Sequence, residues 1–131
     1  MARNEPRTRP CPASVRNGRL AKAEQFASAA ELIDEPADGD QDLCDAFVTL
    51  CVHAGIAAAD VICCAKLGRH ATGESHDEPK RLVGLVDPGA GQALGTLLGM
   101  KTKAGYSALP MSATDRRRAS APPRLCSPRP G

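Results

Sequence analysis

The sequence predicts an all-α protein: a four- to five-helix bundle with one long central helix and disordered N- and C-terminal ends. Its 131 residues are enough for a single domain. Aromatic residues make up 2% of the chain and Trp is absent, so Leu, Ile, Val and Ala must form the core. Strands usually draw on aromatic and β-branched residues, whereas small apolar residues suit closely packed helices. Apolar residues also recur at helical spacing through the middle of the chain, between ends rich in Pro and Arg.

The central helix is predicted to run from about residue 41 to residue 67. Two neighbouring rows of side chains along this segment are apolar, and its remaining side still holds Val52 and Ile56. A helix that is apolar nearly all round lies at the centre of its bundle or is shared with another subunit. Gly68 is the expected C-cap, because glycine readily takes the left-handed conformation that ends helices.

Amphipathic spacing predicts shorter helices on both sides of the central one, each bounded by Pro, Gly or acidic residues. Asp40 or Asp42 is the expected N-cap of the central helix. Ser112 is expected to cap a last helix, which the Pro- and Arg-rich sequence after Asp115 ends almost at once. The other helices are expected at about residues 15–33, 78–86 and 91–106, the first after a cap at Ser14 and the last after a turn at residues 87–89.

The domain organisation follows from these elements and from the charge pattern. We expect a disordered arm at residues 1–13, the bundle at 14–115 and a disordered basic tail at 116–131. Residues 24–79 contain twelve acidic and two basic side chains, whereas both flanking regions are basic. Basic ends can attract nucleic acid through its phosphates, or they can be solvated without a partner.

The sequence predicts a cytoplasmic protein that does not enter a membrane. The longest charge-free run in the apolar centre, residues 46–59, is shorter than the ~20 residues that a membrane-spanning helix needs. The N-terminus has no apolar stretch of the kind found in secretory signals. In the cytoplasm the six cysteines are expected to stay reduced.

No metal or cofactor is expected. The neighbouring residues Cys63 and Cys64 would point roughly 100° apart on a helix, and so do not form the spaced pairs typical of zinc sites. Buried thiols acting as small hydrophobic groups are the better interpretation.

Three stretches of the chain resemble successive segments of one helical family. They are RLAKAEQFASAAELI (19–33), DAFVTLCVHAGIAAADVICCAKLG (45–68), in which HAGIAAAD is the most distinctive part, and KTKAGYS (101–107). Over about residues 15–113 the chain resembles a HEPN-type domain, a family of higher eukaryotes and prokaryotes associated with nucleotide binding. The resemblance implies a helical bundle that is often dimeric and serves toxin–antitoxin, defence or RNA-processing systems.

Active members of this family are metal-independent ribonucleases that use an Arg and a His a few residues apart. Arg69 and His76 have such a spacing, but they follow the long helix, whereas the family motif lies near the later helix. At that later place the chain offers Lys101 and Tyr106 without a His. In some systems of this family a tyrosine near the His is modified by a nucleotidyltransferase partner. These four residues are the catalytic candidates.

The resemblance and the missing motif together predict a non-catalytic interaction module that forms a homodimer through Val52, His53 and Ile56. A nucleotidyltransferase-type protein and RNA are the further partners that the resemblance implies. One alternative is a ribonuclease in which His76 takes the 2′-hydroxyl proton and Arg69 stabilises the phosphorane. Another is a truncated protein without stable function, because the change of composition after about Arg116 is typical of a shifted reading frame.

Overall fold

The computed structural model describes residues 7–34, 43–72 and 77–120. Within these residues five helices form a bundle in which one long helix is central, which confirms the predicted all-α class. Two very short strands accompany them. In chain order the elements are β1 (Thr8–Pro10), α1 (Ala13–Asp34), α2 (Cys44–Leu67), β2 (Arg69–Ala71), α3 (Asp77–Val86), α4 (Pro88–Tyr106) and α5 (Ala113–Ser120).

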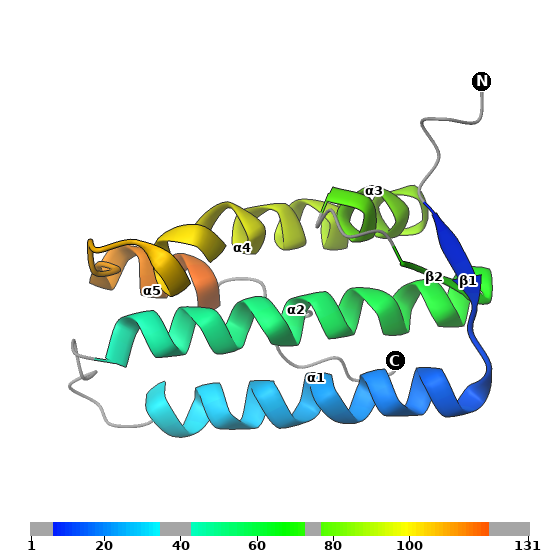
Figure 1. Ribbon diagram of the computed structural model, residues 1–131, viewed down its shortest axis with the longest axis horizontal. Coiled ribbons are helices and arrows are strands. Elements are labelled where there is room, and N and C mark those ends of the chain that lie inside the picture. The colour runs from blue at the N-terminus through cyan, green and yellow to red at the C-terminus, as the bar shows by residue number, and fades with distance from the viewer. Residues whose placement is uncertain (1–6, 35–42, 73–76, 121–131) are drawn as a thin grey trace.

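The helices lie in layers (Figure 1). The helix α1 forms one layer, α2 the middle layer, and α3 and α4 together the layer on the other side of α2. The helix α5 packs near the start of α2, whereas β1 and β2 lie at the far end of α2. As predicted, α2 is central and ends at Gly68, whose φ of 69° is left-handed and whose N–H donates to the carbonyl of Cys64 at 3.0 Å.

Small and aliphatic side chains fill the core. Val48, Val52, Leu94 and Leu97 are completely or almost completely buried, and alanines of α1 and α2 allow the helices to approach closely. By length and composition α2 could cross a membrane, since an 18-residue window of it has a mean hydropathy of 2.0. However, 67% of that window is buried inside the molecule, which is typical of the core helix of a soluble protein.

The junction between α3 and α4 is a single residue rather than the predicted turn over residues 87–89. Asp87 caps α4, because its Oδ1 accepts a hydrogen bond from the N–H of Ala90 at 3.0 Å, and Pro88 occupies the first turn of the helix. The two helices then cross closely, and a Cβ on Gly91 would lie 2.9 Å from the Cα of Gly84.

The prediction of a disordered arm is wrong for the described residues of the N-terminus. The strand β1 pairs antiparallel with β2, with Thr8 opposite Ala71 and Pro10 opposite Arg69. Three-residue strands are too short to leave an alternating pattern in the sequence. The predicted cap at Ser14 is also wrong, because α1 begins at Ala13 and the N–H groups of Val15 and Arg16 donate to the carbonyl of Pro12.

The expectation that all cysteines stay reduced is also wrong. Cys11 and Cys64 form a disulfide across 53 residues of sequence. Cys44, Cys51 and Cys63 are buried and lie outside this disulfide, in keeping with the predicted burial of the thiols. The sequence alone did not indicate that Cys11 would lie beside the end of α2, because that proximity depends on the β1–β2 pairing.

The last helix extends further than expected. Ser112 caps it as predicted, accepting from the N–H of Asp115 at 3.1 Å, but the helix continues to Ser120. Arg116, placed in the disordered tail by the sequence analysis, is 7% exposed, with its guanidinium carbon 5.1 Å from the centre of the Phe47 ring. A basic residue can be buried when its charge rests on an aromatic face. The predicted caps Asp40 and Asp42 lie outside the described residues.

Candidate functional site

A solvent-facing pocket of about 320 Å³ lies between the first half of α2 and the last two turns of α4. The side chains that line the pocket include an imidazole, an ammonium group, a phenol and a hydroxyl, together with apolar atoms. Its lining residues are Thr49, Val52, His53, Lys101, Gly105 and Tyr106.

The α2 wall contains two of the three residues predicted to form an interface, Val52 and His53. His53 is exposed, and its ring packs against Phe26 of α1 with 5.4 Å between ring centres and a tilt of 32°. Ile56, one turn further on, is half-buried. Val52 is only 1% exposed, so the protein's own core covers it and only its edge reaches the pocket. In the described part of the chain no hydrogen bond holds His53, so the ring contact with Phe26 is what positions it.

The α4 wall contains two of the four catalytic candidates. The Nζ of Lys101 lies 5.6 Å from the centre of the Tyr106 ring, a cation–π geometry. Tyr106 is 78% exposed at the last position of α4, so its hydroxyl is accessible to another molecule. Lys101 is half-buried and supplies the pocket with a positive charge.

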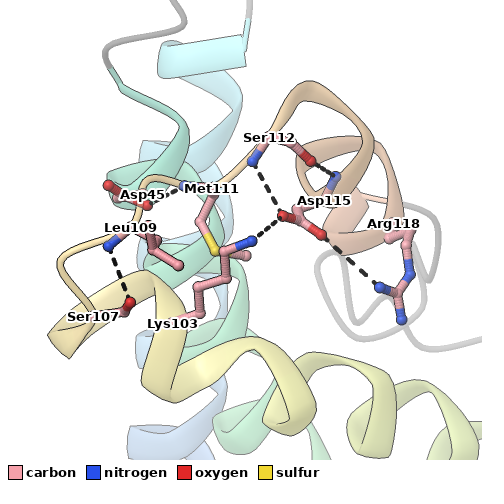
Figure 2. A network of polar contacts seen from close by, with 8 residues as sticks. All are labelled: Asp45, Lys103, Ser107, Leu109, Met111, Ser112, Asp115 and Arg118. Atoms are coloured by element: carbon pink, nitrogen blue, oxygen red, sulfur yellow. Dashed lines mark hydrogen bonds and ion pairs between the residues drawn. The ribbon is translucent and has the colours of Figure 1, made fainter.

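A network of polar contacts fixes the chain directly after the pocket (Figure 2). The N–H of Met111 donates to the Oδ1 of Asp45 in the first turn of α2 at 2.8 Å. Lys103 of α4 donates to the Oδ2 of Asp115 at 3.3 Å, and this same oxygen accepts from the N–H of Ser112 at 3.1 Å. These contacts connect the end of α4 to the start of α2. They therefore fix the positions of the two pocket walls relative to each other.

The structure does not bring all the predicted catalytic residues together. Arg69 lies on β2 at the opposite end of α2, where its Nε donates to the hydroxyl of Thr8 at 2.6 Å. His76 lies outside the described residues. Lys101 and Tyr106 do share a site, and the histidine beside them is His53, which the sequence analysis assigned to an interface. Only the packing of α4 on α2 reveals this combination, since more than forty residues of sequence separate the two walls.

A second polar cluster lies further along α2, close to His70 of β2. The Oδ2 of Asp60 accepts from the Nε of Arg19 at 2.9 Å, and Asp60 is 7% exposed. Burial raises the pKa of Asp60, although the positive charges of Arg19 and His70 oppose this shift. Burial, helped by the charge of Asp60, raises the pKa of the neighbouring Cys63 thiol to about 12. No cluster of three or more metal-ligating side chains occurs in residues 7–34, 43–72 and 77–120.

Comparisons with known proteins identify no relative of this chain. No family model matches the chain, and no curated protein or solved structure shows significant similarity to it.

Proposed function

We propose that this chain is a non-catalytic, HEPN-like interaction module that forms a homodimer in the cytoplasm. One observation carries the proposal: the first half of the central helix leaves one continuous stripe uncovered beside the pocket. Spacings of three and four residues place its members on a single helix face. The stripe consists of Ala46, Thr49, Leu50, His53 and Ile56, all exposed or half-buried.

The composition of this stripe suits a symmetric interface. In a two-fold dimer the same patch of each subunit meets its copy, so the patch must be self-complementary. An apolar centre with a polar edge satisfies this condition. Leu50 and Ile56 supply apolar surface, and His53 with Phe26 supplies aromatic surface that can pack on its equivalent. Thr49 and Lys101 supply the polar edge.

Sedimentation velocity of the purified chain at micromolar concentration tests this proposal. We expect a dimer for the native sequence and a monomer for His53→Glu, because the substitution places like charges opposite each other across the two-fold axis. His53 is exposed, so the variant should keep the helical circular dichroism of the native chain.

Leu85→Glu is the control, since it adds the same negative charge at an exposed helix position, 73% exposed, on α3 and away from the stripe. It should remain dimeric. A native chain that sediments as a clean monomer contradicts the proposal, and so does a dimer that His53→Glu leaves intact.

A second candidate function, a metal-independent ribonuclease, is favoured by the combination of His53 and Lys101 in one pocket. An imidazole can take the proton of a 2′-hydroxyl, and an ammonium group can stabilise the charge that develops on the phosphorane. The test is cleavage of a fluorogenic RNA in EDTA. Activity that His53→Ala and Lys101→Ala abolish, and that Lys103→Ala retains, would replace the first proposal; intact RNA after prolonged incubation excludes this candidate.

The proposed setting is a toxin–antitoxin or RNA-related system with a nucleotidyltransferase as partner. The exposed hydroxyl of Tyr106 supports it, because such an enzyme needs an accessible acceptor. Co-expression with a nucleotidyltransferase encoded beside the gene should add the mass of one or more nucleotides to the chain. Tyr106→Phe should not gain this mass. An unchanged mass of the native chain contradicts this setting.

A further inference from the structure

The N-terminal strand is held on the bundle by few non-covalent contacts. Only three residue pairs form the β1–β2 ladder. Beyond them, the N–H of Cys11 donates to the carbonyl of Gly68 at 2.9 Å, and the N–H of Thr72 donates to the carbonyl of Arg7 at 3.0 Å. A two-stranded ribbon is marginally stable in water even when it is longer than this one. These contacts therefore need additional support to keep β1 in place.

The Cys11–Cys64 disulfide provides that support. Cys11 follows β1 directly, and Cys64 lies in the last turn of α2, so the bond fastens the strand to the end of the central helix. Cys64 is 6% exposed, whereas Cys11 is half-buried. Of the five cysteines that the structure describes, Cys11 is the one that solvent reaches most readily.

The neighbouring free thiol does not compete for this bond. Cys63 is 1% exposed and remains protonated at neutral pH, because burial raises its pKa to about 12. The thiolate is the attacking species in disulfide exchange, so Cys63 does not scramble the pair from within the protein. The geometry therefore allows the disulfide to be reduced by one route, which is attack on Cys11 by the thiolate of another molecule.

We propose that the Cys11–Cys64 disulfide is a redox-operated clasp: a site for a dithiol reductant of the thioredoxin class that decides whether β1 is docked on the bundle. One thiolate of the reductant attacks the Sγ of Cys11, the S–S bond breaks, and its electron pair goes to the Sγ of Cys64, which takes a proton. The second thiol of the reductant, as its thiolate, attacks the mixed disulfide and releases Cys11, which is protonated in turn. The reductant leaves as its own disulfide, so two electrons and two protons have passed to the protein.

Opening the clasp changes the surface at one end of the molecule. Release of β1 frees the guanidinium of Arg69, which otherwise donates to the hydroxyl and carbonyl of Thr8. It also uncovers β2, which contains His70. This side chain interacts electrostatically with the buried Asp60. The helices keep their packing, because the core residues of α2 and α4 contact one another without β1. The clasp is distinct from the stripe on the first half of α2, so it stands independently of the dimer.

Hydrogen–deuterium exchange on the full-length chain, oxidised and then reduced with dithiothreitol in native buffer, tests the proposal. Peptides covering residues 7–11 and 69–72 should exchange ~10-fold faster or more after reduction, while peptides from the middle of α2 and α4 should not change. Cys11→Ser should exchange rapidly in both conditions. Cys44→Ala, which removes a thiol but retains the clasp, should respond to reduction as the native chain does.

Trypsin provides an independent readout. Cleavage between Arg69 and His70 should accelerate on reduction, whereas the Arg9–Pro10 bond resists trypsin in either state. Three results would overturn the proposal. They are equal exchange in both redox states, exchange that rises uniformly in all helices, and a disulfide that dithiothreitol reduces only after the protein is denatured.

Discussion

Two charged side chains are buried among the described residues, and each is held in a different way. Arg116 lies over the ring of Phe47 and donates to the carbonyl of Ile33, whereas Asp60 forms an ion pair with Arg19. For Asp60, burial outweighs the attraction of Arg19 and His70, so its pKa is raised. The free-energy cost of burying the Asp60 carboxylate thus exceeds the stabilisation that Arg19 and His70 provide, which is common for buried ion pairs.

The raised pKa of Asp60 predicts a pH dependence of stability. Above 3.8, the ordinary value, the unfolded chain loses the proton that the folded chain still holds, so the free energy of unfolding falls as pH rises towards the raised native pKa. Asp60→Asn has no proton to lose, and should lack this contribution. Urea unfolding between about pH 4 and pH 7 measures it.

The measured quantity is the difference between the two proteins, because other carboxylates have the opposite effect. Hydrogen bonds from Ser112 lower the pKa of Asp115, which adds stability that is lost as pH falls. This contribution is common to both proteins and cancels. Parallel curves of unfolding free energy against pH for the native chain and Asp60→Asn would contradict the prediction.

At the scale of elements, the sequence predicted what depends on local periodicity and missed what depends on distant contacts. The end of α2 at Gly68 and the cap at Ser112 were correct, because glycine and serine have local conformational preferences at helix ends. The strands β1 and β2 were missed because neither is stable without the other. The continuation of α5 was missed because the face of Phe47, which covers Arg116, belongs to another helix.

The close crossing of α3 and α4 makes a prediction for glycine substitutions. Gly91→Ala would place a methyl group 2.9 Å from the Cα of Gly84, so the helices must separate, at a cost of about 1–3 kcal/mol in the free energy of unfolding. Gly99→Ala is the control on the same helix. It meets nothing within 4 Å and should stabilise the protein by about 0.5–1 kcal/mol.

Urea denaturation of the two variants beside the native chain measures both effects. Shifts of the same sign would show that helix propensity, rather than the approach of the two backbones, dominates at Gly91.

At the scale of the whole molecule, the layered arrangement creates the candidate site. Lys101 and Tyr106 could be selected because they stand where the resembled family carries its motif, and His53 because it lies among apolar neighbours on the long helix. Their meeting in one pocket could not, since a helical pattern shows which face is buried but not which neighbour buries it. The same reason explains why Val52, predicted at an interface, is covered by the protein's own core.

The disulfide should contribute to the stability of the whole molecule. In the chain-entropy account, closing a loop across 53 residues restricts the unfolded chain and stabilises the folded one by about 4 kcal/mol. Urea unfolding of the oxidised chain and of the chain kept reduced measures this difference. Both should remain helical before the transition, and the reduced chain should unfold at lower urea. Coincident transitions would contradict the prediction.

The pairing of Cys11 with Cys64 also bears on how the chain is made. Synthesis proceeds from the N-terminus, so Cys11 leaves the ribosome long before its partner and meets Cys44 and Cys51 first. Both of these thiols become buried once α2 folds against α1. Folding of that helix pair therefore removes these two thiols from the reach of Cys11 and leaves Cys64, at the end of the same α2 helix, to pair with it.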